Sequence, residues 1–254
     1  MKNETRLRGT ARVGWLLPSE HIDVWRIHLL THGSHDVSES VLSPDEIARA
    51  QRFRFARDRQ RFVECRSAIR EILGRYLKIA AQEIRFRHEV NGKPEVIETQ
   101  NPQRLRFNIS HSSDLAVMAV VARSAIGIDI EKIRPDVECL QLAKRFFSEK
   151  EFRTLQSLPA DEKQRAFFAC WTRKEAFIKA IGEGLSFPLS GFSVSVMPDA
   201  SAELQEVEED SSAISRWALM NLELEGGYIG ALAVEGSARQ LHFCSLDDAC
   251  KVAE

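Results

Sequence analysis

The stretch FFACWTRKEAFIKAIGEG, residues 167–184, has the period of an amphipathic helix and predicts the central helix of the fold. Its apolar side chains recur at helical spacing and form a stripe that should face a core: Phe167, Trp171, Ile178 and Ile181. Glycines follow, and glycine adopts left-handed backbone angles without steric cost. We therefore expect a core helix with Asp161 as its N-cap, ending at Gly182 and Gly184.

Glu175 and Lys179 lie one turn apart on a neighbouring stripe of this helix, so their side chains point the same way. The plain interpretation is a solvated ion pair worth about 0.3–0.5 kcal/mol. The alternative is that the pair forms one half of an active site. The other half must then come from elsewhere in the chain.

Length and charge limit the classes of protein to consider. The 254 residues can bury a full core, as one domain or as two halves. The net charge of −2 argues against a dedicated nucleic-acid binder or a polybasic membrane anchor. The longest apolar run, Leu115–Ala122, is far shorter than a membrane span, and residues 1–12 lack the apolar region of a signal peptide.

The cysteines indicate a reducing compartment. There are five, widely spaced, with no C-x-x-C motif and no cysteine–histidine cluster at the spacing of zinc ligands. We therefore expect free thiols in a cytoplasmic protein: Cys65, Cys139, Cys170, Cys244 and Cys250.

Helices and strands are mixed without a βαβ rhythm, which predicts an α+β fold with antiparallel sheets. Residues 1–12 should be a loose start, 31–40 a polar connection and 199–212 a solvated loop. Asn91-Gly92 predicts a hairpin turn. Strands are expected at 22–29, 84–88, 93–97, 107–111, 115–122, 126–131, 191–197, 217–224 and 230–234, and helices at 140–147 and 149–158.

A very basic helical stretch begins at Ser43-Pro44, with proline at the first helical position. One interpretation is a polyanion partner, either a nucleic acid or a nucleotide phosphate. The other is a solvated face whose arginine stems cover apolar surface, which should hold for most of these arginines. They stand at positions 49, 52, 54, 57, 59, 61, 66, 70 and 75.

Two carboxylates share one face of the strand at 126–131. Because side chains alternate along a strand, Asp129 and Glu131 point away from Ile128 and Ile130 and start about 6.5–7 Å apart. Hard oxygen ligands without Cys or His suit Mg²⁺, and Glu175 could supply a third carboxylate. Alone, the Asp-x-Glu pattern is better explained by two solvated charges at a strand end before Lys132 and Arg134.

Two smaller signals remain. Ser110-His111 ends a strand, and a protonated imidazole there could donate to a phosphate, although a single His is more often structural. Gly92-Lys93-Pro94 presents one cation on a tight turn.

Taken in order, these motifs resemble the 4′-phosphopantetheinyl transferases of the Sfp type. The resemblance covers residues 43–195 well and both ends loosely. The matching blocks are NGKP (91–94), FNISHS (107–112), IGIDIEKIRP (126–135), AKRFFSEKEF (143–152), WTRKEAFIKAIGEGLSFPL (171–189) and GFSV (191–194).

The resemblance implies an enzyme that moves the phosphopantetheine arm of coenzyme A (CoA) onto a serine of an apo acyl or peptidyl carrier protein. The other product is adenosine 3′,5′-bisphosphate. It also implies two pseudosymmetric α+β halves, at 1–124 and 125–254, with packed helices and the CoA cleft between them. A two-half chain could complete its site as a monomer, with no nucleic acid or membrane as partner.

The family motifs also imply roles for single residues. Mg²⁺ would be held with the CoA diphosphate by Asp129, Glu131 and Glu175. Lys179 and Lys174 would lie beside the phosphates. The 3′-phosphate and adenosine side would be contacted by Arg49, Arg61, Gly92, Lys93, Ser110 and His111.

The same resemblance indicates the catalytic groups. The carrier serine must lose a proton, directly or through a metal-bound water, and Glu175 and Glu151 are the candidate bases, with Glu175 preferred. Asp129 and Lys179 would act on the diphosphate charge. One position departs from the family pattern, because relatives often carry Lys where this chain has Glu46, so one phosphate contact should be weaker or come from a neighbouring arginine.

Two other classes fit less well. A nucleic-acid-binding module built on the arginine-rich helix would need no metal and leaves the acidic residues unexplained. A relative that only binds CoA would not need all three carboxylates and Lys179.

Overall fold

The computed structural model describes residues 17–29, 39–88, 92–184, 187–208 and 210–246. The predicted loose start at 1–12, most of the polar connection at 31–40 and Asn91 of the hairpin turn lie outside these ranges. The predicted strands and the two short predicted helices are all present, with ends that differ from the prediction by at most three residues.

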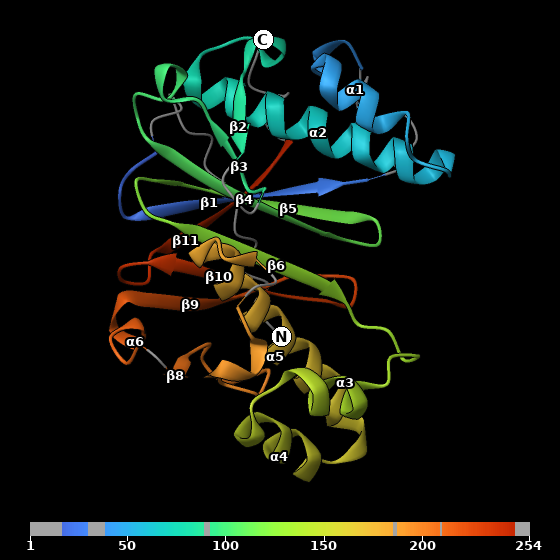
Figure 1. Ribbon diagram of the computed structural model, residues 1–254, viewed down its shortest axis with the longest axis vertical. Helices are drawn as coiled ribbons and strands as arrows, with labels where there is room; N and C mark the ends of the chain where they lie inside the picture. The colour runs from blue at the N-terminus through green and yellow to red at the C-terminus, as the bar shows by residue number, and fades with distance from the viewer. Residues whose placement is uncertain (1–16, 30–38, 89–91, 185–186, 209, 247–254) are drawn as a thin grey trace, which may run out of the picture.

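A four-stranded sheet with the order β11-β1-β5-β4 forms the N-terminal half. The strands are β1 (His21–His28), β4 (Leu105–Ser112), β5 (Leu115–Ala122) and β11 (Gln240–Ser245). Helix α2 (Ala56–Leu77) covers one face (Figure 1), where Ile72, Leu73 and Tyr76 pack with Trp25 and Met118.

The C-terminal half repeats this arrangement with a second long helix. Its sheet has the order β6-β10-β9, and helix α5 (Ala160–Ile181) covers it. The strands are β6 (Ile126–Lys132), β9 (Trp217–Leu222) and β10 (Tyr228–Glu235). Phe167 and Ile178 of the predicted stripe are buried in the core, and Trp171 and Ile181 pack against it.

The two ends of α5 show what the sequence predicted and what it did not. Gly182 ends the helix with φ 78°, as expected. The helix starts earlier than predicted, after Pro159, so Asp161 lies inside the first turn and is not the N-cap. Its carboxylate still favours that end, because the N-terminal turn of a helix carries partial positive charge.

Two strands correct the sequence analysis. β11 was not expected, and it pairs with β1 in parallel, so the sheets are not wholly antiparallel. β11 belongs to the predicted C-terminal half (125–254), but it is a strand of the sheet formed by the N-terminal half. The boundary predicted at residue 124 therefore does not separate the two sheets completely. The region 199–212 is not simply a solvated loop, because β8 (Leu204–Val207) pairs with β7 (Phe192–Val194) and buries Leu204 and Val207.

The basic stretch divides into two helices, α1 (Pro44–Ala50) and α2. Ser43 caps α1 in a reciprocal capping box with Glu46. Glu46 also accepts a hydrogen bond from the buried Arg70 at 2.7 Å. Glu46, which departs from the family pattern, thus pairs with an arginine inside the protein.

The remaining elements are short. They are β2 (Phe86–His88), β3 (Pro94–Val96), α3 (Cys139–Phe146), α4 (Glu149–Ser157) and α6 (Ala213–Arg216), with 3₁₀ turns at Glu39–Val41, Ala81–Glu83, Glu98–Gln100 and Leu189–Gly191.

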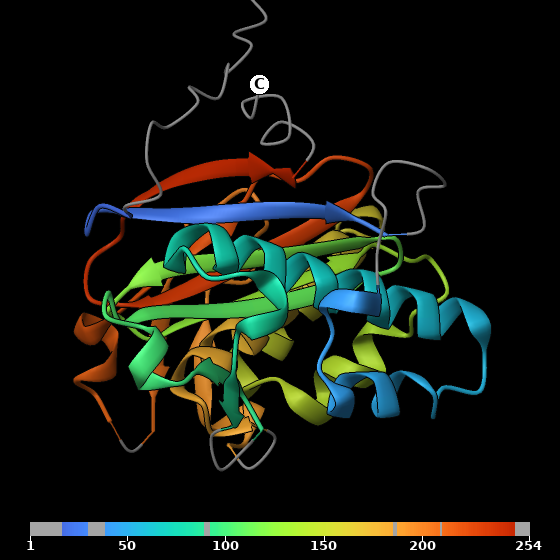
Figure 2. The same cartoon turned by 90° about the horizontal axis from the view of Figure 1, so that it is seen from above.

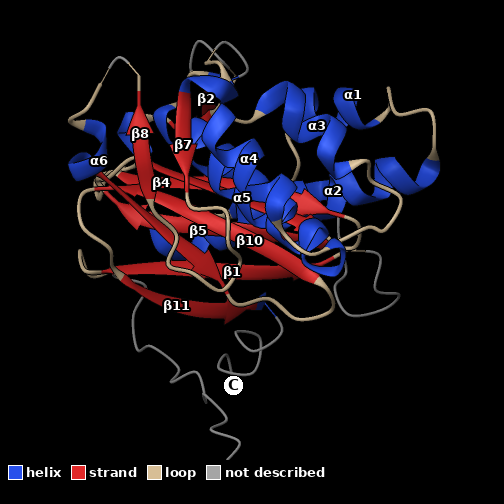
Figure 3. Ribbon diagram, turned by 90° about the horizontal axis from the view of Figure 1, so that it is seen from below, coloured by secondary structure: helices blue, strands red, loops and turns tan. Residues whose placement is uncertain are grey.

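The two sheets stack face to face between the long helices (Figure 1), and seen from above α2 lies over the strands (Figure 2). Side chains from both sheets fill the space between them, among them Val24, Val117, Ile128 and Leu232. In Figure 3 the strands form the middle of the molecule and the helices gather along one side. None of the helices that the structure describes is long and apolar enough to cross a bilayer.

Candidate active site

Strand β4 is joined to β6 by side chains rather than by a backbone ladder. The N–H groups of Ile128, Ile130 and Lys132 donate to side-chain oxygens of every second residue of β4: Asn108, Ser110 and Ser112. These contacts fix β6 at the seam between the two sheets. The alternation Asn-x-Ser-x-Ser in FNISHS is the sequence signal for this seam, and the sequence analysis did not use it.

The same serines hold the two acidic side chains of β6. Ser110 Oγ donates to Asp129 Oδ1 at 2.8 Å, and Ser112 Oγ donates to Glu131 Oε2 at 2.7 Å. The predicted alternation of the strand therefore holds, with both carboxylates on the side of β4. Ser110 was assigned to the adenosine side, but the structure places it against Asp129.

Helix α5 lies very close to β6 because Gly127 has no side chain. A Cβ at this position would be 2.1 Å from Ala176 O and 2.3 Å from Ala180 N. The close approach brings the last turns of α5 over the acidic strand, where Lys179 Nζ lies 2.6 Å from Asp129 Oδ1 and 3.2 Å from Ser110 Oγ.

Burial raises the pKa of two of these acids, Asp129 and Glu175. Asp129 is 5% exposed, and burial raises its pKa, while Lys179 and Ser110 oppose that rise. The pKa of Glu175 is also raised, mainly by burial and then by the charges of Asp129 and Glu131. The three carboxylates are thus close enough to repel one another.

Asp129 Oδ2 is buried and has no hydrogen-bond partner. A buried oxygen without a partner is costly, and a cation would satisfy it. Three carboxylates without Cys or His form a donor set that suits Mg²⁺, which usually keeps several waters and is completed by substrate phosphates. The residue types therefore fit this ion. The three carboxylates would have to close around it, because among the described residues they are not a group whose ligand atoms all lie within 4.8 Å of one another.

Glu151 and Lys174 form a separate, fully buried pair. Lys174 Nζ donates to both carboxylate oxygens of Glu151 at 2.7 and 2.8 Å, and the two side chains are 1% exposed or less. Glu151 also accepts from the Val194 and Ser148 N–H groups. Both residues are thus parts of the interior, which corrects their assignment as a candidate base and a phosphate contact.

The chain matches the family model of the 4′-phosphopantetheinyl transferase superfamily over residues 125–233, and the model of the 4′-phosphopantetheinyl transferase N-terminal region over 31–123. The chain belongs to the 4′-phosphopantetheinyl transferase superfamily. The first match contains Asp129, Glu131, Glu175 and Lys179, and the second contains the basic helices.

Individual transferases agree with this assignment. The 4′-phosphopantetheinyl transferase HetI of Nostoc sp. is 38% identical over 229 residues, 89% of this chain and 93% of that protein. The transferase Sfp of Bacillus subtilis is 33% identical, covering 74% of this chain and 80% of its own length. The L-aminoadipate-semialdehyde dehydrogenase-phosphopantetheinyl transferase of Mus musculus is 32% identical over 78% of this chain and 70% of its own length.

The remaining candidate residues of this transferase do not gather at the acids. Arg61 donates to Asp114 at 2.5 Å, near the β4–β5 turn. Arg49 lies over the Phe62 ring at 5.4 Å and lines a groove between α1 and the β2 region. His111 is exposed, and strand alternation puts it on the face of β4 opposite Ser110.

Lys93 joins the two halves. Its Nζ donates to the carbonyls of Ile126 and Lys179 at 2.8 and 2.7 Å, and so reaches the start of β6 and the end of α5. Gly92 beside it has φ 81° and open space where a side chain would be. The predicted tight turn therefore places its cation next to the last turn of α5.

Proposed function

We propose that this transferase moves the 4′-phosphopantetheine arm of CoA onto a serine of an apo acyl or peptidyl carrier protein and releases adenosine 3′,5′-bisphosphate. One observation carries the proposal: a chain of this superfamily brings Asp129, Glu131, Glu175 and Lys179 to one seam between its halves. The acids carry a charge excess that a divalent cation would balance, and Lys179 adds a cation beside them.

Mg²⁺ is the ion that this donor set fits. Held by Asp129, Glu131 and Glu175, it would neutralise charge on the diphosphate and on the leaving oxygen. Lys179 already donates to Asp129, so its ammonium is positioned at the same place without further ordering.

Glu175 is the preferred base. The carrier serine oxygen forms a bond to the β-phosphorus, and the bond from that phosphorus to the bridging oxygen breaks. The bridging oxygen leaves with the bond electrons on adenosine 3′,5′-bisphosphate, and the serine proton passes to the Glu175 carboxylate. Glu175 must be ionised to accept this proton, and a cation held beside Asp129, Glu131 and Glu175 would favour its ionised form.

The adenosine and 3′-phosphate end of CoA is assigned to the N-terminal half. Arg61 lies at the edge of this half and is 24% exposed in its side chain, and its partner Asp114 is 48% exposed. A 3′-phosphate can therefore exchange with a solvated carboxylate. Arg49, Gly92, Lys93 and His111 complete the proposed set. Both halves of the site come from one chain, which supports a monomeric enzyme.

The test is transfer itself. The full chain is incubated with CoA, Mg²⁺ and a panel of apo carrier proteins from fatty-acid, polyketide, nonribosomal-peptide and aminoadipate systems, and intact mass reports the added arm. Transfer to at least one carrier is expected, with loss in EDTA and restoration by Mg²⁺. Carriers that stay apo while an established transferase modifies the same panel would overturn the proposal.

A further inference from the structure

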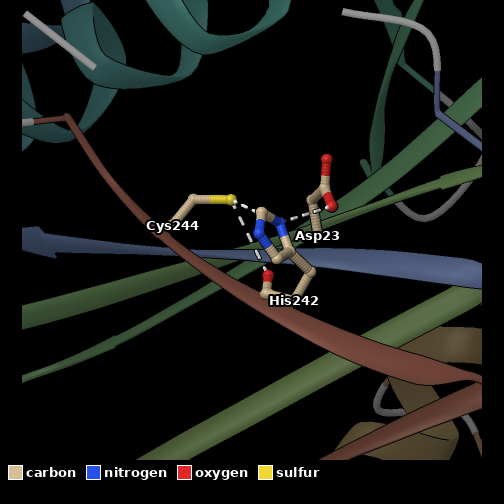
Figure 4. Close-up of side chains that lie close together, drawn as sticks. All are labelled: Asp23, His242 and Cys244. Carbon is tan, nitrogen blue, oxygen red and sulfur yellow. Dashed lines mark hydrogen bonds and ion pairs between the residues drawn. The ribbon is translucent and has the colours of Figure 1, made fainter. Parts of the chain in front are cut away.

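A second cluster of possible metal ligands lies on the N-terminal sheet, away from the acidic residues of β6. β1 and β11 run in parallel, and Asp23 stands opposite His242 in the register. Cys244 follows two residues later on β11, so it shares the face of His242. Strand pairing thus sets an oxygen, a nitrogen and a sulfur side by side (Figure 4).

The ligand atoms converge. Asp23 Oδ1 lies 3.2 Å from His242 Nδ1, and Cys244 Sγ lies 3.3 Å from the same nitrogen. Of all described residues, these three form the one group of possible ligands whose atoms all lie within 4.8 Å of one another. Ligands around a tetrahedral zinc ion stand about 3.3–3.6 Å apart, given zinc bond lengths of about 2.0–2.3 Å.

One ring nitrogen, Nδ1 of His242, lies within reach of both the carboxylate and the thiol. The thiol also donates to the backbone carbonyl of His242 at 3.7 Å, as a dashed line in Figure 4 shows. The three possible ligand atoms therefore meet around this one nitrogen. A cation between the three atoms would contact all of them at once.

The carboxylate is held by a second layer of buried groups. Tyr76 Oη donates to Asp23 Oδ2 at 2.5 Å and accepts from Trp25 Nε1 at 2.9 Å. Trp25 and Tyr76 are each 1% exposed. Such outer contacts orient first-layer ligands in metal sites, and here they direct Oδ1 toward His242.

Metal can reach the cluster from the edge of the sheet. β11 is the outermost strand of the described four-stranded sheet, and the His242 side chain is 29% exposed, whereas that of Asp23 is 4% exposed. The three ligands are therefore held at Asp23, which is buried, and open to solvent at His242, where a water could complete four-coordination of the ion.

We propose that Asp23, His242 and Cys244 bind one zinc ion. Mixed N, S and O ligands suit Zn²⁺, whereas Mg²⁺ prefers oxygen alone, so this site differs in chemistry from the acidic site on β6. The ion ties the last described strand to the first. Its role is structural and is independent of the proposed transfer reaction.

Cobalt gives a readout specific to the thiolate. The reduced, chelator-treated full chain is titrated with Co²⁺ in excess Mg²⁺, and absorption is recorded. A thiolate-to-cobalt charge-transfer band that saturates at one equivalent and is removed by Zn²⁺ is expected. The carboxylates of β6 cannot produce this band. Its absence at one equivalent would overturn the proposal.

Variants show which residues bind the cobalt ion that produces the charge-transfer band. Cys244→Ser should abolish it, and His242→Gln and Asp23→Asn should each weaken Co²⁺ binding at least tenfold. Cys65→Ser is the matched control, because Cys65 is a free thiol packed against the same core and should keep the band. A band that survives Cys244→Ser, or is lost in Cys65→Ser, contradicts the assignment.

A thermal measurement covers variants that fold poorly. Zn²⁺ should raise the Tm of the wild-type chain and of Cys65→Ser, because a ligand that binds only the folded state stabilises it. It should leave the Tm of His242→Gln and Cys244→Ser unchanged. An equal Tm rise in all four proteins would place zinc elsewhere and refute the site.

Discussion

Lys179 Nζ lies 2.6 Å from Asp129 Oδ1, and this contact joins the last turn of α5 to the middle of β6. Asp129 is almost fully buried, and the ammonium offsets part of the cost of its charge. The pair therefore holds together a site whose three acids would otherwise repel one another. A dense acidic site of this kind is expected to be costly for stability and useful for catalysis.

Removing the carboxylate of either Asp129 or Glu175 should abolish transfer without unfolding the protein. Asp129→Ala and Glu175→Ala should each lower kcat/KM by about 100-fold or more, because electrostatic stabilisation of the transition state is lost. Intact mass of a carrier measures the rate, and circular dichroism checks the fold. Glu149→Ala is the control, since Glu149 pairs only with the exposed Arg153. A folded variant with near wild-type rate in Mg²⁺ would remove that acid from the site.

Glu175→Gln should stabilise the metal-free protein. The pKa of Glu175 is raised in the folded state, so the folded protein holds the proton more tightly than the unfolded chain does. Stability from this group is therefore full below the unfolded pKa and is lost as pH rises through the folded one. The amide of the Glu175→Gln variant does not ionise and so avoids this loss of stability. The Tm of the variant should therefore exceed the Tm of the wild type at pH 7, and the difference between the two Tm values should disappear in acid.

Thermal scans from pH 4 to pH 8 in EDTA measure the gap. A variant whose Tm is lower than wild type at pH 7 would show that the carboxylate is favourably held without metal.

Much of the site could be predicted from the sequence because its signals are local. Strand alternation places Asp129 and Glu131 on one side, and helical spacing places Glu175 beside Lys179. The family motifs supplied the pairing of strand with helix. Contacts between distant segments were harder. The alternation Asn-x-Ser-x-Ser puts Ser110 on one face of its strand, but it does not say that Asp129, 19 residues later, lies against that face.

Contacts between residues far apart in the sequence explain what the sequence analysis missed. Lys174 and Lys179 are two lysines of the same helix, and the sequence does not distinguish them. Only the packing shows that the Lys174 ammonium lies in the core beside Glu151. β11 was missed because it joins a sheet formed more than a hundred residues earlier in the chain. In both cases the deciding contact is long-range, which residue types alone do not reveal.

Arg61→Ala and His111→Ala should weaken binding of the 3′-phosphate. Each should raise the KM for CoA by more than the KM for dephospho-CoA, because the second compound lacks the phosphate that these two side chains are proposed to contact. Asp114→Asn, which frees Arg61 from its partner, is the matched comparison and should not raise the KM for CoA. Equal effects on both substrates would take Arg61 and His111 away from the 3′-phosphate.

Lys174→Met should be strongly destabilising, by about 3–5 kcal/mol, because it leaves the Glu151 carboxylate buried without its cation. The double variant Glu151→Met/Lys174→Met should regain much of this loss, since no charge then stays unpaired. Urea unfolding measures each free energy. If Lys174→Met is as stable as wild type but has a raised KM for CoA, Lys174 contacts the substrate after all.

Gly127→Ala should damage both the fold and the site. Its Cβ would overlap backbone atoms at Ala176 and Ala180, and backbone cannot rotate away as a side chain can. Overpacking of this kind costs about 1–3 kcal/mol, or more where the neighbour is rigid. Relief requires α5 to move off β6, which would separate Glu175 and Lys179 from Asp129.

The folded fraction of Gly127→Ala should therefore show a kcat at least tenfold lower, since small displacements of positioned groups are costly in rate. Gly191→Ala is the control, because the three nearest atoms that its Cβ would meet belong to the side chains of Pro188 and Glu208, at 3.3 Å or more. That variant should keep the rate and most of the stability. Wild-type rate in Gly127→Ala would mean that α5 can leave its close contact with β6 without disturbing the acids, so helix position and catalysis would not be coupled.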